Sequence, residues 1–158
     1  MSIPLPPNSI PDALPGPPFI GALLRIVLQH VRDRMLQAIH EAGFVDFQET
    51  HFALFSFPLP DGMRPSELAR HKRMSRQAVN YLLSQLEDLG YVERRAADGS
   101  DRRLVYVTPR GHEVVAAIFG CLRQLHAQWS EEVGKERFDD FVDVLKQLSI
   151  KAQEPTNR

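Results

Sequence analysis

The sequence predicts a mainly α-helical fold with one small β-hairpin. Three observations predict it: apolar residues recur three or four positions apart in several segments, capping residues stand at the ends of those segments, and two strand-like runs flank Asp98-Gly99. The 158 residues suffice for one compact unit and are few for two independent ones. We therefore expect one folded unit that is preceded and followed by a tail.

The N-terminal part changes character at residue 19. Seven of the twelve prolines fall within residues 1–18, which excludes helix and favours an extended or disordered arm. Helical spacing of apolar residues then predicts a long helix over residues 19–42. Asp46, with Glu49 three residues later, resembles a capping box and predicts a short second helix before Pro58.

A helix-turn-helix follows. Pro65 begins a short helix, and Ser75 precedes a second helix over residues 76–89 that stops at Gly90. One stripe of the second helix is apolar and belongs to the core, whereas the opposite face is small and polar. That polar face consists of Gln77, Asn80, Tyr81 and Ser84.

The next segment predicts a β-hairpin. Residues 91–95 and 104–108 are rich in Val, Tyr and Leu, and the Asp-Gly between them is a strong turn signal. Thr108 caps a further helix with Pro109 at its first position. After an interruption near Gly134, the same apolar spacing gives a last helix that ends at about residue 150.

The charges are segregated along the chain. The net charge is −1, but residues 64–110 hold ten Lys/Arg against six Asp/Glu. Four cations crowd into seven residues of the helix-turn-helix: Arg70, Lys72, Arg73 and Arg76. A solvated face is the ordinary explanation of such a run, and a nucleic-acid contact is the alternative.

The polar helix face has the side chains that base edges require. Arg reads guanine and Asn or Gln reads adenine in the major groove, and first-turn residues come closest to the bases. Arg76, Gln77 and Asn80 stand at such positions. The helix N-terminus at Ser75 also offers backbone N–H groups to a phosphate. A merely solvated polar face is the competing interpretation.

The hairpin carries a second cationic group. Arg102 and Arg103 follow Asp101 directly after the turn, and narrow minor grooves attract arginine. Asp101 is suited to hold a guanidinium in a bidentate pair. Considered alone, this motif is more simply a solvated ion pair at a hairpin tip.

Five strings in order and spacing resemble the multiple antibiotic resistance regulator (MarR) family of winged-helix repressors. They are Pro-Ser-Glu-Leu-Ala at 65–69, Ser-Arg-Gln-Ala-Val at 75–79, Leu-Glu-Asp-Leu-Gly-Tyr-Val-Glu-Arg at 86–94, Asp-Gly-Ser-Asp-Arg-Arg at 98–103 and Val-Thr-Pro-Arg-Gly at 107–111. The resemblance covers nearly the whole chain after the proline-rich arm.

The resemblance implies a winged helix-turn-helix with N- and C-terminal dimerisation helices. Residues 44–108 would be the DNA-binding region, with residues 75–89 as recognition helix, the hairpin as wing, and Asp101 with Arg103 as the wing-tip pair. The dimerisation region would comprise residues 19–43 and 109–150, and residues 151–158 would form a tail. The residues expected to contact DNA are Lys72, Arg73, Ser75, Arg76, Gln77, Asn80, Tyr81, Ser84, Asp101, Arg102 and Arg103.

The turn departs from the family pattern. Lys72 and Arg73 stand where such regulators usually place an apolar residue and a glycine. If the second position requires positive φ, Arg73 costs backbone strain. The two cations would in return add phosphate contacts.

Members of this family commonly release DNA when a small aromatic or anionic ligand binds near the dimer helices. Five of the nine phenylalanines fall within fourteen residues in that region, although such clusters are more often core than pocket. The histidines are individually more often surface or structural groups. The candidate pocket residues are His30, Phe44, Phe47, His51 and Phe55.

Other classes of function lack signals. The single Cys121 has no histidine at ligand spacing, His112 has no ligand four residues later, and no phosphate loop, catalytic elbow or cofactor motif occurs. No signal peptide or membrane span is present, so we expect a cytoplasmic protein. The sequence thus predicts a ligand-responsive repressor that binds double-stranded DNA as a homodimer. The alternative is a winged-helix scaffold that has lost DNA binding.

Overall fold

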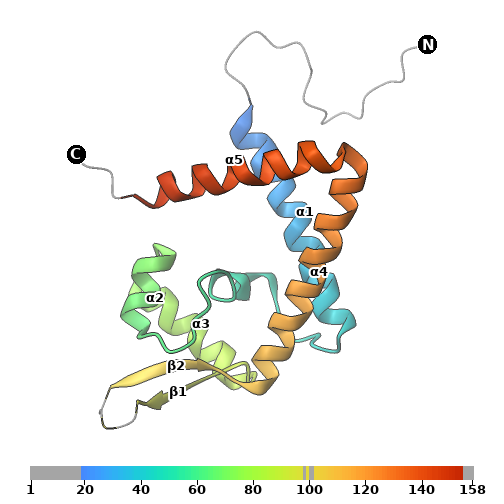
Figure 1. Cartoon of the computed structure of the whole chain (residues 1–158). Helices are drawn as coiled ribbons and strands as arrows, with labels where there is room; N and C mark the ends of the chain where they lie inside the picture. Colours follow the sequence, from blue (N-terminus) through green and yellow to red (C-terminus); the bar gives the residue numbers. More distant parts are fainter. Residues whose placement is uncertain (1–18, 98, 100–101, 155–158) are drawn as a thin grey trace.

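Two long helices, α1 (Ile20–Glu41) and α4 (Pro109–Val133), lie side by side and carry the rest of the chain (Figure 1). The computed structural model describes residues 19–97, 99 and 102–154. The proline-rich arm at residues 1–18 and the wing-tip Asp101 lie outside the described residues. In the described part the predicted order of elements is confirmed, except that the short element after α1 is not an α-helix.

The helix-turn-helix consists of α2 (Pro65–Lys72) and α3 (Arg76–Asp88). Ser75 caps α3, because its Oγ accepts from the backbone N–H of Ala78 at 3.1 Å. The predicted apolar stripe of α3 is buried, while the opposite face is exposed. This burial against the core fixes which side of α3 faces solvent.

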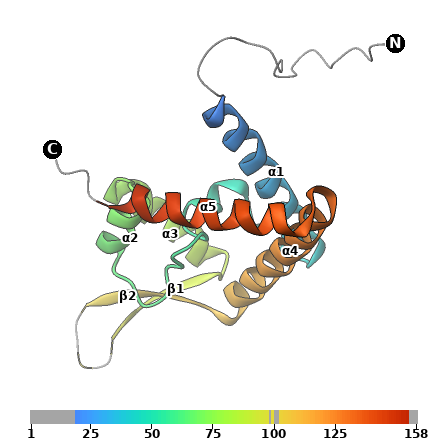
Figure 2. The same cartoon turned by 45° about the horizontal axis from the view of Figure 1, so that its top comes forward.

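The hairpin pairs β1 (Val92–Ala96) with β2 (Arg103–Val107) in antiparallel register, from Val92 opposite Val107 to Ala96 opposite Arg103. The segment before α2 also joins β2, since Val105 donates its N–H to the Met63 carbonyl at 2.8 Å. Sequence patterns did not predict this contact. It attaches the start of α2 to the wing, by which we mean β1, β2 and their connection (Figure 2).

The short element after α1 differs from the predicted α-helix. It is a 3₁₀ turn, η1 (Glu49–Ala53), capped by Gln48 and His51 rather than by Asp46. The Asp46 carboxylate is engaged elsewhere, with Tyr91 and Arg110. Because those partners lie more than forty residues away in sequence, local spacing could not reveal them.

An aromatic cluster forms the centre of the core. The ring of Phe47 is fully buried and meets the rings of Phe52, Phe55 and Tyr91 edge to face, with centroids 5.3, 5.5 and 5.5 Å apart. Edge-to-face contact is a preferred arrangement of aromatic pairs. The phenylalanine-rich segment is therefore mainly core, the more ordinary of the two interpretations.

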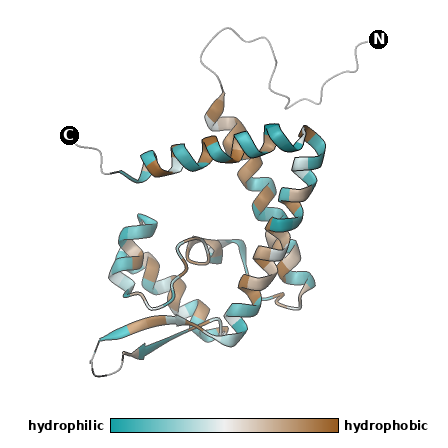
Figure 3. Ribbon diagram, in the orientation of Figure 1, coloured by the Kyte–Doolittle hydropathy of each residue, from teal (hydrophilic) through white to brown (hydrophobic). Residues whose placement is uncertain are grey.

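The last helix, α5 (Lys135–Gln153), turns sharply at the end of α4 and runs back toward the side of the molecule on which α2 lies (Figure 1). Phe138 anchors it and is 6% exposed. Beyond that anchor, α5 has solvent-exposed apolar side chains, and so does the first half of α1 (Figure 3). In the single chain, these apolar faces of α1 and α5 are not covered by the other residues that the structure describes.

The turn between α2 and α3 is strained at one residue. Arg73 adopts the left-handed conformation with φ 51° and ψ 42°, and it is the sole non-glycine residue with positive φ in the described part of the chain. The position therefore requires the geometry that glycine adopts freely. The backbone strain that was expected for Arg73 at a position of positive φ is therefore present.

We predict that Arg73→Gly raises the free energy of unfolding by about 0.5–1 kcal/mol, because relief of left-handed strain exceeds the added entropy of the unfolded chain. Urea denaturation followed by circular dichroism measures this. Arg73→Ala is the control, since it removes the same charge and keeps the strain. Equal stability of the two variants would contradict the explanation.

Candidate nucleic-acid interface

A basic groove lies between the helix-turn-helix and the wing, with a volume of about 410 Å³. Four of its seven lining residues are arginines, and none carries a carboxylate. The lining residues are Arg64, Pro65, Ser66, Arg76, Asn80, Arg102 and Arg103. The start of α2, the start of α3 and the wing thus bring positive charge to one place, which suits a polyanion.

The polar face of α3 forms one wall of this region. All five α3 residues that were expected to contact DNA are exposed, and Tyr81 is 64% exposed. These side chains are Arg76, Gln77, Asn80, Tyr81 and Ser84. Because Leu83 and Leu86 on the opposite side are fully buried, α3 cannot rotate to hide its polar face without opening the core.

Lys72 takes part in the fold of the turn. Its ammonium donates to the carbonyls of Ser56 and Pro58 at 2.6 and 2.9 Å and to the Ser56 hydroxyl at 3.0 Å. Burial lowers the pKa of this ammonium. Three acceptors occupy its three N–H groups, so Lys72 holds the loop after η1 onto α2. The neighbouring Arg73 side chain is exposed.

The wing presents its arginines at the start of β2. Arg102 and Arg103 are both exposed. The expected pair between Asp101 and Arg103 involves a residue outside the described ones. Further along the wing, the guanidinium of Arg95 lies over the Tyr106 ring, 3.8 Å from its centroid, and pairs with Glu93 at 3.1 Å. This stack stiffens the outer surface of the hairpin.

Two arginines of the site were not predicted. Arg64 lines the groove from the residue just before α2. Arg94 on β1 lies against α3 and donates to Glu87 Oε2 from both Nε (2.9 Å) and Nη2 (2.6 Å). This pair holds the pKa of the Glu87 carboxyl below its usual value. Arg94 stands inside one of the family strings, but sequence alone did not indicate its partner.

Arg94 also contacts two residues that were expected to contact DNA. Its Nη2 donates to Ser84 Oγ at 3.2 Å and its Nη1 to Asn80 Oδ1 at 3.5 Å. Asn80, Ser84 and Glu87 are spaced by four and three residues, so they line one face of α3. Strand β1 is thereby joined to α3 along that face.

A polar cluster joins the winged region to the long helices. The Tyr91 hydroxyl donates to Asp46, and Arg110 at the start of α4 donates to Asp46 Oδ2 at 3.0 Å. Burial, together with the hydrogen bond to Asp46, raises the pKa of Tyr91 to about 12. The Arg110 guanidinium also lies 4.8 Å from the centroid of the Tyr91 ring. Three elements meet in this cluster: the loop after α1, the entry to β1 and α4.

The structure packs Phe47, His51 and Phe55 together inside the core, and of the five candidate pocket residues only His30 lies apart. Phe47, Phe55 and His51 are at most 2% exposed and belong to the core. Phe44 packs against Tyr91, 6.2 Å between ring centroids. His30 lies halfway along α1 and faces α4.

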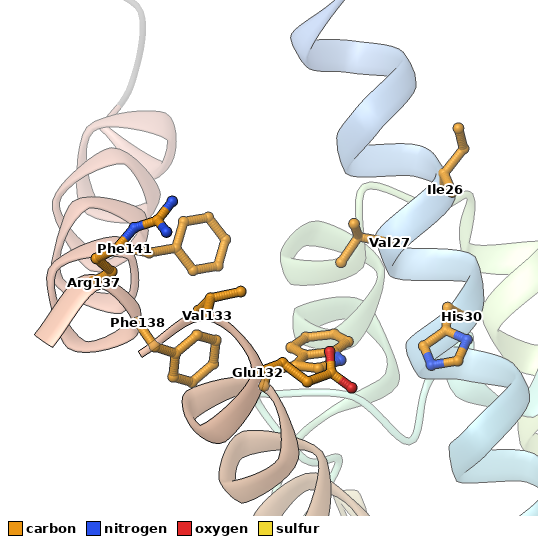
Figure 4. Close-up of a pocket in the computed structure, with 9 residues that line it drawn as sticks. Ile26, Val27, His30, Glu132, Val133, Arg137, Phe138 and Phe141 are labelled. Carbon is orange, nitrogen blue, oxygen red and sulfur yellow. The ribbon is translucent and has the colours of Figure 1, made fainter. Parts of the chain in front are cut away.

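His30 instead lines a separate apolar cleft of about 630 Å³ between α1, α4 and α5 (Figure 4). Its ring stacks on Trp129 at 6.2 Å between centroids. Arg137 brings a guanidinium to the α5 side of the same cleft, and Glu132 brings a carboxylate. The cleft therefore combines aromatic walls with the Arg137 guanidinium and the Glu132 carboxylate.

The described residues contain neither a cluster of metal-ligating side chains nor a helix suited to span a membrane. Within residues 19–97, 99 and 102–154, no three His, Cys, Asp or Glu side chains cluster as metal ligands would. None of the helices described here is long and apolar enough to cross a membrane. Cys121 is buried on α4, which raises the pKa of its thiol.

Comparisons with known proteins agree with this geometry. Residues 59–104 match the family model described as MarR family. The chain is 28% identical over 154 residues to the transcriptional repressor MprA of Escherichia coli strain K12, covering 85% of this chain and 77% of MprA. It is 32% identical over 88 residues to the HTH-type transcriptional repressor Rv2887 of Mycobacterium tuberculosis H37Rv, covering 55% and 63% of the two chains.

Solved structures show the same fold. The crystal structure of the Mycobacterium tuberculosis MarR family protein Rv2887 with salicylic acid superposes with a TM-score of 0.59 at 27% identity, covering 87% of this chain and 98% of that one. A MarR transcriptional regulator from Methanosarcina mazei Go1 gives a TM-score of 0.67 at 15% identity, covering 85% and 89%. The five helices and the two-stranded hairpin are thus a winged-helix arrangement already seen in other proteins.

We predict that acid weakens the fold through His51. Its Nδ1 accepts from the Gln48 N–H at 3.0 Å, and burial, the largest effect, lowers its pKa below 6.5, opposed by the Gln85 hydrogen bond and the Asp46 charge. The unfolded chain therefore binds the proton first. The contribution of His51 to stability is complete above pH 6.5 and is lost as pH falls through the folded-state pKa.

The measurement is thermal unfolding at a series of pH values from about 7.5 to 5. His51→Gln should flatten the loss of melting temperature on acidification. His71→Gln is the control, because His71 is exposed and should leave the pH profile unchanged. An unaltered profile in His51→Gln would mean that another group titrates.

Proposed function

Because the chain belongs to the MarR family of DNA-binding transcription regulators, we propose that it represses transcription by binding a pseudo-palindromic operator as a homodimer. The observation that carries the proposal is the basic groove beside an exposed, polar recognition helix. In this proposal α3 enters the major groove and the wing arginines enter the adjacent minor groove. The family is one of regulators rather than enzymes.

We assign the parts of the chain accordingly. Residues 44–108 bind DNA, and residues 19–43 with 109–150 form the dimer. Gln77 and Arg76 read base edges, and Arg103 reaches the minor groove with support from Asp101. Phosphate contacts come from Arg73 and the groove arginines, while Lys72 keeps its structural bonds to the loop after η1.

The uncovered apolar faces support a homodimer. On α5 they include Phe141 and Leu148, 43% and 55% exposed, and on α1 Ile20 and Leu23, 62% and 50% exposed. Apolar faces of this size on a single chain mark interaction surfaces. Two copies related by a two-fold axis would cover both faces and would present two recognition helices to one side of a duplex.

A small aromatic anion is the effector that the chemistry favours. Trp129 and Phe138 offer aromatic walls in the α1–α4–α5 cleft, and Arg137 offers a cation. Rv2887, a relative at 27% identity, was crystallised with salicylic acid. We therefore propose that such a ligand binds in this cleft and weakens DNA binding.

DNA recognition is tested by selecting bound duplexes from a random pool. We expect an enriched inverted repeat whose affinity falls with salt.

Gln77→Ala should cost on the order of 1–3 kcal/mol at particular base pairs and leave non-specific binding nearly intact. Arg103→Ala should weaken binding to the selected duplex, and added salicylate should weaken the wild type.

Glu136→Gln is the control for these titrations, since it lies on α5 outside the groove. Failure to enrich any sequence would favour the alternative function, a winged-helix scaffold that does not bind DNA. Equal losses of Gln77→Ala for selected and scrambled duplexes would contradict base reading by Gln77.

The homodimer is tested by sedimentation of the full chain at micromolar concentration. We expect twice the mass of one chain, and Leu148→Glu should shift the species toward monomer because it places a charge in the interface. Phe57→Glu is the matched control, since Phe57 is 91% exposed and lies outside the proposed interface. A wild-type monomer that still binds an inverted repeat tightly would overturn this arrangement.

A further inference from the structure

The contact between Arg94 and Asn80 fixes the orientation of an amide in the basic groove. Arg94 Nη1 lies 3.5 Å from Asn80 Oδ1. A guanidinium has donors and no acceptor, so the oxygen rather than the nitrogen of the amide must face it. The two N–H groups of Asn80 Nδ2 are then left for another partner, and Nδ2 has no acceptor among the described residues.

Arg94 is itself held firmly. Its Nε and Nη2 both donate to Glu87, its Nη2 also donates to Ser84, and its backbone N–H donates to Glu87 Oε1 at 3.1 Å. The side chain is 22% exposed. A guanidinium is planar, so fixing two of its nitrogens fixes the third, Nη1, toward Asn80.

The other polar side chains of the groove are also donors. Its four arginines donate only, the Ser66 hydroxyl can donate, and no lining residue carries a carboxylate. Phosphodiester oxygens only accept, whereas base edges present donors and acceptors together. If α3 occupies the major groove and the wing the minor groove, the DNA strand between those grooves must pass through the space between helix and wing.

We propose that the basic groove is a phosphodiester site in which Asn80 donates from Nδ2 to a backbone phosphate, with Arg94 as the positioning residue that sets this orientation. The proposal rests on the proposed DNA-binding function and revises one part of it. Asn80 was expected to read adenine, which requires both the oxygen and the nitrogen of the amide. Here the oxygen is turned toward Arg94, so the oxygen and the nitrogen do not both face one adenine edge.

The decisive variant is Asn80→Asp, which keeps the shape of the side chain. The new carboxylate still accepts from Arg94, so the fold is retained, but it faces the phosphate with negative charge. Affinity should fall about tenfold or more for selected and scrambled duplexes alike. Gln77→Glu is the matched comparison on the same helix, and it should instead change base preference.

A neutral phosphate analogue locates the contact. Methylphosphonate is placed singly at each position of the selected duplex. One position in each half-site should abolish the penalty of Asn80→Asp, because the repulsion disappears with the phosphate charge. The same substitution should not rescue Gln77→Glu.

A double-mutant cycle tests the positioning role of Arg94. Glu87→Gln with Arg94→Met removes the pair without leaving a charge unpartnered. In that background the amide is free to turn, and Asn80→Ala should lose less affinity than it does in the wild type. Circular dichroism of each variant verifies that it is folded.

Three outcomes separate the possibilities. Loss of affinity confined to the selected duplex in Asn80→Asp, with a new base preference, would show that Asn80 reads bases and would overturn the proposal. Absence of any rescuing methylphosphonate position would also overturn it. No binding of any duplex by the wild type would instead refute the DNA-binding function on which the proposal rests.

Discussion

The burial of Tyr91 is the constraint on which the rest of the structure depends. Its ring packs against Phe47 and Phe55, while its hydroxyl donates to Asp46. Its carbonyl accepts from the Thr108 N–H at 3.1 Å, which sets the start of α4. A Cβ on Gly111 would lie 2.1 Å from the same carbonyl oxygen, so only glycine allows α4 to approach this closely. One residue therefore fixes the wing, the aromatic core and α4 relative to one another.

Charge placement matters more to this protein than its total charge. The chain has a net charge of −1, yet four arginines from three segments line one groove. Other cations of the same region are held by local acceptors: Lys72 by loop carbonyls and Arg94 by Glu87. Cations with an internal partner shape the surface, whereas Arg103 and Arg73 extend from it. Which cations have an internal partner depends on the three-dimensional structure, so it cannot be read from a count of charged residues.

Local sequence patterns predicted the helices and strands, whereas the partners of the polar side chains depend on contacts between residues distant in sequence. The caps at Ser75 and Thr108 act within three residues, so the sequence displays them directly. The strain at Arg73 was likewise expected, from the missing glycine. Asp46 resembled a cap but pairs with distant Tyr91, and Arg94 selects its partners across the interface between β1 and α3. Long polar side chains reach several neighbours, so their partners are settled by tertiary packing rather than by spacing.

Helix α4 connects the apolar cleft at one end to the winged region at the other. Its first turn holds Arg110 against Asp46, and its later turns place Trp129 in the apolar cleft. One uninterrupted helix of 25 residues joins them, and at 1.5 Å per residue the two positions are about 29 Å apart. A ligand in the cleft changes DNA binding only as far as it prefers one orientation of α4 over another. Because the Gly111 backbone packs directly against the Tyr91 carbonyl, we expect a change in the tilt of α4 to be transmitted to the start of the wing.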